Sequence, residues 1–150
     1  MKSRNLVIEI ICTLLILLFV YTASSKLVDL PKSYHEMDNQ PFQNWMTPYL
    51  LWGISLSELT VAGMLLFNKT KKAGLWGSLI LMTLFTGYIT AILLRFFDRV
   101  PCSCGGVVRK LGWYNHLYFN LFFMLISIIG LLLLRKKRPE QSQLTEIVFT

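Results

Sequence analysis

The chain has 150 residues, of which 54% are hydrophobic and 15% are charged, and its formal net charge is +7. One soluble domain could have this length, but so apolar a composition is typical of a membrane protein. The basic residues stand beside the apolar runs and form no compact soluble patch, which argues against a nucleic-acid partner.

Four apolar runs follow one another along the chain, each with about the 20 residues that a helix needs to cross ~30 Å of hydrocarbon. Helices are expected because lipid offers the backbone no hydrogen-bond partner. The sequence therefore predicts an all-α, polytopic four-helix bundle in one domain, residues 1–138. Its spans are expected at about 5–25, 48–67, 74–97 and 113–134. No Ala-x-Ala cleavage site follows the first run, so we expect a retained anchor.

The distribution of Lys and Arg predicts the orientation. The two most compact basic clusters, Lys69–Lys72 and Arg135–Arg138, fall on the same side as the N-terminus. The positive-inside rule then places both termini, and a polar and loosely ordered tail at 139–150, in the cytoplasm. The Cys102/Cys104 loop is then expected outside, where disulfides persist, and in a bacterium this side would be the periplasm.

The first outer loop, residues 26–47, is rich in proline and aromatic residues, including Pro31, Tyr34, Phe42 and Trp45. This composition favours an amphipathic segment on the membrane surface over a floppy linker.

The motif whose side chains are best suited to a reaction is Pro101-Cys-Ser-Cys-Gly-Gly106, between the third and fourth runs. A disulfide between Cys102 and Cys104 would remove only about 1.6 kcal/mol of unfolded-state entropy. A strained, accessible disulfide suits exchange better than support. Nearby Arg99 and Arg109 would favour thiolates. A structural pair and a soft-metal site remain alternatives.

His116 is the obvious helper, because histidine exchanges protons near neutral pH. It could also be the third ligand of a soft metal, or simply an interfacial histidine bonded to a carbonyl or head group. Asn120 follows four residues later on the same helical face and could orient the imidazole ring.

Glu58 falls near the middle of the second span, where an ionised carboxylate is costly. It should be neutral, paired or facing a polar cavity. It could relay protons, anchor a quinone-like ligand, or make an interhelical hydrogen bond that fixes the bundle. A stripe on the third span, Thr83, Thr86 and Thr90, could supply its partner.

Three residues of the first span have plainer explanations. Lys26, at the outer end, can anchor the helix at the head groups or contact the dithiol loop. Glu9, near the inner boundary, can snorkel or pair with Lys2 or Arg4. Cys12 lies deep in the span, far from the outer pair, and is expected to be an inert packing residue.

Together these motifs resemble the MauE and DoxX membrane family over about residues 5–135. The matching segments are Tyr21–Leu30, Glu58–Leu66, Pro101–Gly106 and Leu111–Asn120. The resemblance implies a four-helix inner-membrane protein linked to redox chemistry. MauE is associated with methylamine utilisation and disulfide formation in the methylamine dehydrogenase light subunit, and DoxX with thiosulfate:quinone oxidoreduction. The architecture is also similar to vitamin K epoxide reductase-like enzymes, but this chain lacks their Cys-x-x-Cys pair and second outer pair.

The leading prediction is a membrane thiol–disulfide protein whose site residues are Cys102, Cys104, His116 and Glu58, with no metal. Expected partners are the lipid bilayer and an extracytoplasmic redox or client protein, which could belong to a larger membrane complex. No resident cofactor is expected, and a membrane quinone could accept the electrons. The sequence leaves open whether the chain is an enzyme. The alternatives are a non-enzymatic subunit or assembly factor and a soft-metal site.

Overall fold

A computed structural model describes the backbone of residues 2–96 and 112–148, and the side chains of residues 3–96 and 112–135. The described residues form helices and connecting turns, with no strand among them. The elements in chain order are α1 (Lys2–Val28), α2 (Leu30–Asp38), the 3-10 turn η1 (Asn44–Met46), α3 (Thr47–Leu66), α4 (Lys71–Leu93) and α5 (Trp113–Val148).

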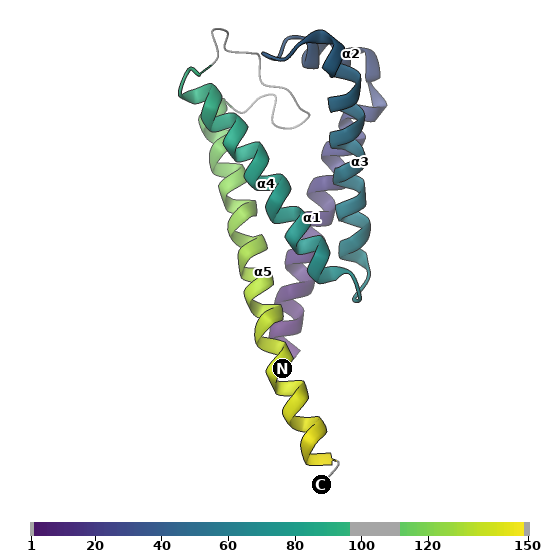
Figure 1. Cartoon of the computed structure of the whole chain (residues 1–150), viewed down its shortest axis with the longest axis vertical. Coiled ribbons are helices and arrows are strands. Elements are labelled where there is room, and N and C mark those ends of the chain that lie inside the picture. Colours follow the sequence, from purple (N-terminus) through teal and green to yellow (C-terminus); the bar gives the residue numbers. More distant parts are fainter. Residues whose placement is uncertain (1, 97–111, 149–150) are drawn as a thin grey trace.

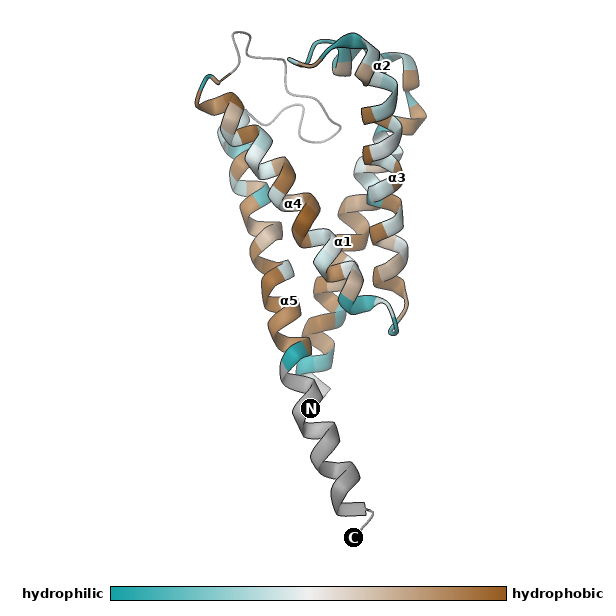
Figure 2. Ribbon diagram, in the orientation of Figure 1, coloured by the Kyte–Doolittle hydropathy of each residue, from teal (hydrophilic) through white to brown (hydrophobic). Residues whose placement is uncertain are grey.

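Four of these helices are long and apolar enough to cross a membrane. The apolar stretches are Ser3–Val28, Asn44–Leu66, Lys71–Leu93 and Trp113–Arg135. Figure 2 shows hydrophobic residues along the four long helices and hydrophilic residues at α2 and in the turn between α3 and α4. The predicted all-α, polytopic membrane bundle is confirmed.

The long helices form two closely packed pairs, α1 with α3 and α4 with α5. The two pairs meet through α3 with α4 and α1 with α5. In Figure 1, α4 leans across toward α1 and α3 at the end that carries the α3–α4 turn, and the pairs spread apart at the end that carries α2. The start of α1 and the end of α5 lie toward the end with the α3–α4 turn (Figure 1).

Tight packing between the pairs depends on small residues of α4. A Cβ atom at Gly74 would lie 2.9 Å from the Leu65 side chain and 3.0 Å from the Leu65 backbone nitrogen. A Cβ at Gly77 would lie 2.8 Å from a methyl group of Val61. Small residues at such crossings let helix backbones approach closely, which is the usual basis of helix association in lipid. Buried Leu15, Leu65 and Leu75 fill the adjoining core.

The predicted surface segment contains the short helix α2. Asp29 caps it, since its carboxylate accepts a hydrogen bond from the Lys32 backbone N–H at 3.3 Å, and Pro31 occupies the first turn. Pro is tolerated there because the first-turn N–H groups have no intrahelical acceptor. The Ser33 hydroxyl donates to the Lys26 carbonyl at 2.9 Å, which ties α2 to the end of α1.

The last helix is longer than predicted. The sequence suggests a loosely ordered tail at 139–150, whereas the helical backbone of α5 continues to Val148. Beyond Pro139 the tail holds two Glu, two Gln and one Leu. These residues have good helix propensity, which favours continuation of the helix.

Candidate functional site

A cavity of about 1030 Å³ lies among all four long helices and the segment after α2. Most of its lining is apolar, with Leu14 and Leu17 from α1, Leu81 and Phe85 from α4, and Phe119 from α5. Polar side chains also face it, and among them are three pairs: Lys26 with Glu58, Gln40 with Tyr88, and His116 with Asn120. A large apolar cavity with a few convergent polar groups is the usual form of a ligand site.

Glu58 is paired with Lys26. The Lys26 ammonium donates to both carboxylate oxygens of Glu58 at 3.0 Å, and also to the Thr22 carbonyl at 3.3 Å. The Glu58 side chain is only 2% exposed, while that of Lys26 is 20% exposed. A lone charge at this depth would be very unfavourable, and the ion pair lowers the cost of burying each of the two charges. The pair joins α1 to α3 on the cavity wall.

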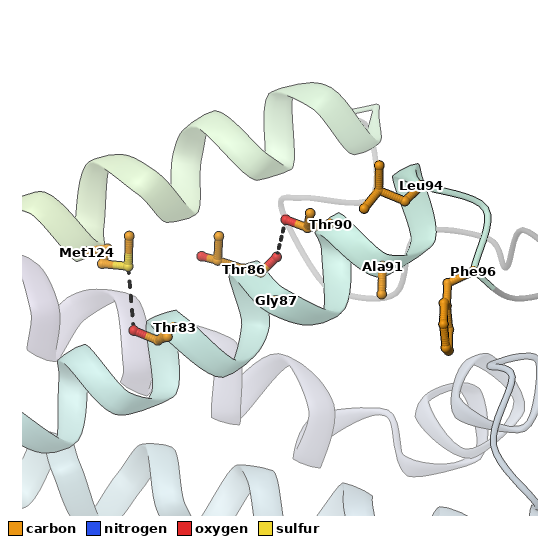
Figure 3. A pocket seen from close by; sticks show the side chains of 8 residues that line it. All are labelled: Thr83, Thr86, Gly87, Thr90, Ala91, Leu94, Phe96 and Met124. Atoms are coloured by element: carbon orange, nitrogen blue, oxygen red, sulfur yellow. Dashed lines mark hydrogen bonds between the residues drawn. The ribbon is translucent and has the colours of Figure 1, made fainter.

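The threonine stripe does not supply the partner of Glu58. The hydroxyls of Thr83, Thr86 and Thr90 each donate to the carbonyl four residues back, at 2.7 to 2.8 Å. Thr83 also approaches the sulfur of Met124 on α5 at 3.5 Å, as Figure 3 shows. These threonines line a second, separate pocket of about 440 Å³. The stripe therefore faces α5 and away from Glu58.

His116 and Asn120 lie one turn apart on α5, and both line the larger cavity. Asn120 is 4% exposed. The side-chain nitrogen Nδ2 of Asn120 and Nδ1 of His116 are both buried and have no hydrogen-bond partner among the described residues. Asn120 therefore does not donate a hydrogen bond to His116, as the sequence suggested it could. Both atoms remain available to a ligand.

Gln40 and Tyr88 form the third polar group, which the sequence analysis did not identify. The Tyr88 hydroxyl donates to the side-chain oxygen of Gln40, and Phe42 stacks on the Tyr88 ring with centroids 5.5 Å apart. These contacts hold the segment after α2 against α4, at the α2 end of the cavity. The sequence did contain one signal for this group, because a tyrosine inside a membrane span, such as Tyr88, usually requires a partner for its hydroxyl.

The two cysteines of the predicted site, Cys102 and Cys104, lie outside the described residues. The described chain stops at Phe96, just after α4, and resumes at Gly112, just before α5. The end of α4 and the start of α5 lie at the same end of the bundle as α2 (Figure 1). The third cysteine, Cys12, is free, 2% exposed and part of the apolar core, which agrees with a packing role.

A second ion pair lies on α1 and α4. Lys71 donates to Glu9 at 2.5 Å and to the Asn68 side chain at 2.9 Å. The sequence suggested Lys2 or Arg4 as a partner of Glu9, and the structure shows that Lys71, from a different helix, is also a partner. Among the described side chains, residues 3–96 and 112–135, no cluster of three or more His, Cys, Asp or Glu could hold a metal ion.

Comparison with known proteins identifies the family. No curated protein and no solved structure matches the chain. A family model, Methylamine utilisation protein MauE, matches residues 4–133, a range that holds the whole cavity lining. This confirms the MauE part of the resemblance, while the DoxX part stays a prediction. The chain is therefore a multi-pass membrane protein that belongs to the MauE family.

Proposed function

We propose that this chain is a thiol–disulfide protein of the inner membrane that acts in methylamine utilisation. Cys102 and Cys104 would exchange disulfides with an extracytoplasmic redox or client protein. The observation that carries the proposal is the Pro101–Gly106 motif in a chain of the MauE family. Two thiols one residue apart form a strained, readily exchanged disulfide, and basic neighbours favour the reactive thiolate.

The exchange needs no further reactant. A thiolate of one pair attacks a sulfur of the other pair's disulfide, a mixed disulfide forms, and the second thiol of the attacking pair resolves it. One pair ends as a disulfide and the other as a dithiol, so two electrons and two protons pass between the proteins. We assign proton transfer to His116, twelve residues after Cys104 and in the first turn of α5.

Glu58 has a supporting role in this proposal. Its ion pair with Lys26 joins α1 to α3 beside the cavity. The pair would keep the helix ends in place at the α2 end of the bundle, and so also the ends of the Cys102/Cys104 connection. Glu58 would therefore be a positioning residue for the exchange.

The proposed orientation has both termini in the cytoplasm. In support, the clusters Lys69–Lys72 and Arg135–Arg138 both stand where an apolar stretch ends, after Leu66 and at Arg135. Under the positive-inside rule, the connection that carries Cys102 and Cys104 then faces the periplasm.

Trapping of the mixed disulfide tests the proposal. We expect either Cys102→Ser or Cys104→Ser to accumulate a covalent complex, because the remaining thiol can attack but its resolving partner is gone. Acid-quenched cells run on a non-reducing gel would show the complex, and reductant would remove it. Cys12→Ser is the control, since its thiol is buried in the core.

The contrary result would favour an assembly factor. If neither single variant captures a protein and the Cys102→Ser/Cys104→Ser double variant keeps full activity, exchange chemistry is wrong. In that case Trp45→Ala should release a co-purifying protein, because Trp45 is 65% exposed on η1 and available to a partner.

A further inference from the structure

We propose that the large cavity binds a membrane quinone, with the ring carbonyl oxygens held by Asn120 and His116. This goes beyond the proposed function, because binding requires only side chains that line the cavity and does not depend on Cys102 or Cys104. The argument rests on the position of the cavity, its charge, its unused hydrogen-bonding atoms and its aromatic lining.

The position of the cavity favours a ligand that arrives from the lipid. Its lining includes Leu14, Leu17, Leu81 and Leu84, all from apolar helices that can cross the membrane. Leu17 and Leu84 are 62% and 63% exposed on the protein surface, where lipid would contact them. The volume of about 1030 Å³ is ample for a quinone ring with the first part of an isoprenoid tail.

The charge of the cavity favours a neutral ligand. Among the described lining residues, Lys26 is the only Lys or Arg and Glu58 is the only Asp or Glu, and they neutralise each other. A fatty acid or an anionic lipid head group would need a cation of its own, and it could take Lys26 only by leaving Glu58 buried and unpaired. A quinone carries no charge and imposes no such cost.

The unused polar atoms distinguish a quinone from a plain acyl chain. Asn120 Nδ2 carries N–H donors, and together with His116 Nδ1 it is buried and lacks a described partner. A buried donor without an acceptor is unfavourable, and a hydrocarbon chain would leave it so. A quinone carbonyl is an acceptor that can enter an apolar site, and a neutral imidazole with its proton on Nδ1 can donate as well.

The aromatic lining suits a flat ring. Phe85 and Phe119 border the cavity from α4 and α5, and the Phe42–Tyr88 stack borders its α2 end. Aromatic side chains pack well against planar rings in offset or edge-on arrangements. The cavity thus offers apolar surfaces for the ring and tail and donors for the oxygens.

Direct binding tests the proposal. The purified full-length chain in detergent is titrated with ubiquinone-1, a short-tailed quinone, and quenching of tryptophan fluorescence is followed, because Trp113 lines the cavity. We expect saturable binding that Asn120→Leu weakens about tenfold or more, the value of one hydrogen bond to a buried donor. Asn115→Leu is the matched control, since Asn115 is exposed on the same helix and does not line the cavity.

A second pair of variants keeps the test decisive if Asn120→Leu folds poorly. Gly53 lines the cavity, and a Cβ there meets nothing within 4 Å, so Gly53→Phe has room to occupy ligand space. Gly63 on the same helix also has open space but does not line the cavity. Gly53→Phe should abolish binding, and Gly63→Phe should leave it unchanged.

Competition separates a quinone from a lipid. If decanoate displaces ubiquinone-1 at equal concentration and Asn120→Leu binds as the wild type does, the cavity is a general lipid site and the proposal is wrong. Absence of saturable binding also overturns it. The Cys102→Ser/Cys104→Ser variant should bind ubiquinone-1 normally, so a failure of the exchange chemistry and a failure of quinone binding give different results.

Discussion

Lys26 and Glu58 are two charged residues whose presence inside an apolar bundle is explained by one contact. The ammonium meets both carboxylate oxygens at 3.0 Å, and Glu58 is almost wholly buried. In such a place the cost of desolvation rivals the Coulombic gain, so the pair contributes little net stability. Loss of one member should destabilise the protein strongly, because it leaves the other charge buried and unpaired.

We expect Lys26→Met to lower the free energy of unfolding by about 3 kcal/mol, since it leaves the Glu58 carboxylate without its partner. The double variant Lys26→Met/Glu58→Met should regain most of that loss, because it removes both charges. Unfolding in detergent, followed by circular dichroism, measures the effect. Lys32→Met is the control, since Lys32 is exposed on α2. Additive losses in the double variant would show that the two residues are not coupled.

At the scale of the elements, the association of the two helix pairs depends on how closely α4 approaches α3. Gly74 and Gly77 make this approach, while Gly87, ten residues after Gly77, has open space around it. Helix α4 ends without a glycine, because Arg95 takes the left-handed conformation with φ of 53°. The Phe96 N–H donates to the Ala91 carbonyl and the Arg95 N–H donates to the Ile92 carbonyl, both at 3.0 Å. This is the Schellman arrangement of helix ends.

Two glycine-to-alanine changes on α4 should have opposite effects. Gly74→Ala should lower the free energy of unfolding by about 1 kcal/mol or more, because its Cβ would overlap Leu65. Gly87→Ala should raise it by about 0.5 kcal/mol, because alanine loses less backbone entropy in a helix. Thermal unfolding of the two variants in one detergent measures both. Equal effects of the same sign would contradict the close approach at Gly74.

At the scale of the whole molecule, the helices run alternately in opposite directions, so each connection lies at one of two ends. The α1–α2 turn, the end of α4 and the start of α5 share one end, and the N-terminus and the α3–α4 turn share the other (Figure 1). The cavity is formed by all four long helices and the segment after α2, so no single pair of helices could hold it.

A topology test addresses the proposed orientation. We expect a fluorescent protein fused after Thr150 to fluoresce in the cytoplasm. Alkaline phosphatase inserted after Asn39, in the connection between α2 and α3, should be active, because this enzyme folds only where disulfides form. The same insertion after Asn68, between α3 and α4, should be inactive and serves as the control. Activity of the Asn68 insertion with none at Asn39 would reverse the orientation.

Much of the fold could be predicted from the sequence, but less of the candidate site could be. The four apolar runs predicted four membrane helices, because span length is fixed by bilayer thickness. Glu58 was singled out because an ionisable group inside a membrane span needs a partner, and His116 because a histidine near the cysteine motif can exchange protons. Lys26 was not assigned to Glu58, since a separation of 32 residues gives no local pattern that links them. Gln40 and Tyr88, 48 residues apart, were missed for the same reason.

The sequence by itself determined the fold class and the family resemblance, because apolar runs of membrane length and short motifs are local properties of the chain. Only the tertiary structure decided which polar residues meet. It paired Glu58 with Lys26 and turned the threonine stripe toward α5. It also left Asn120 Nδ2 and His116 Nδ1, beside a large cavity, without a hydrogen-bond partner among the described residues. These outcomes depend on how the helices rotate and cross, which is set by packing between segments far apart in the chain.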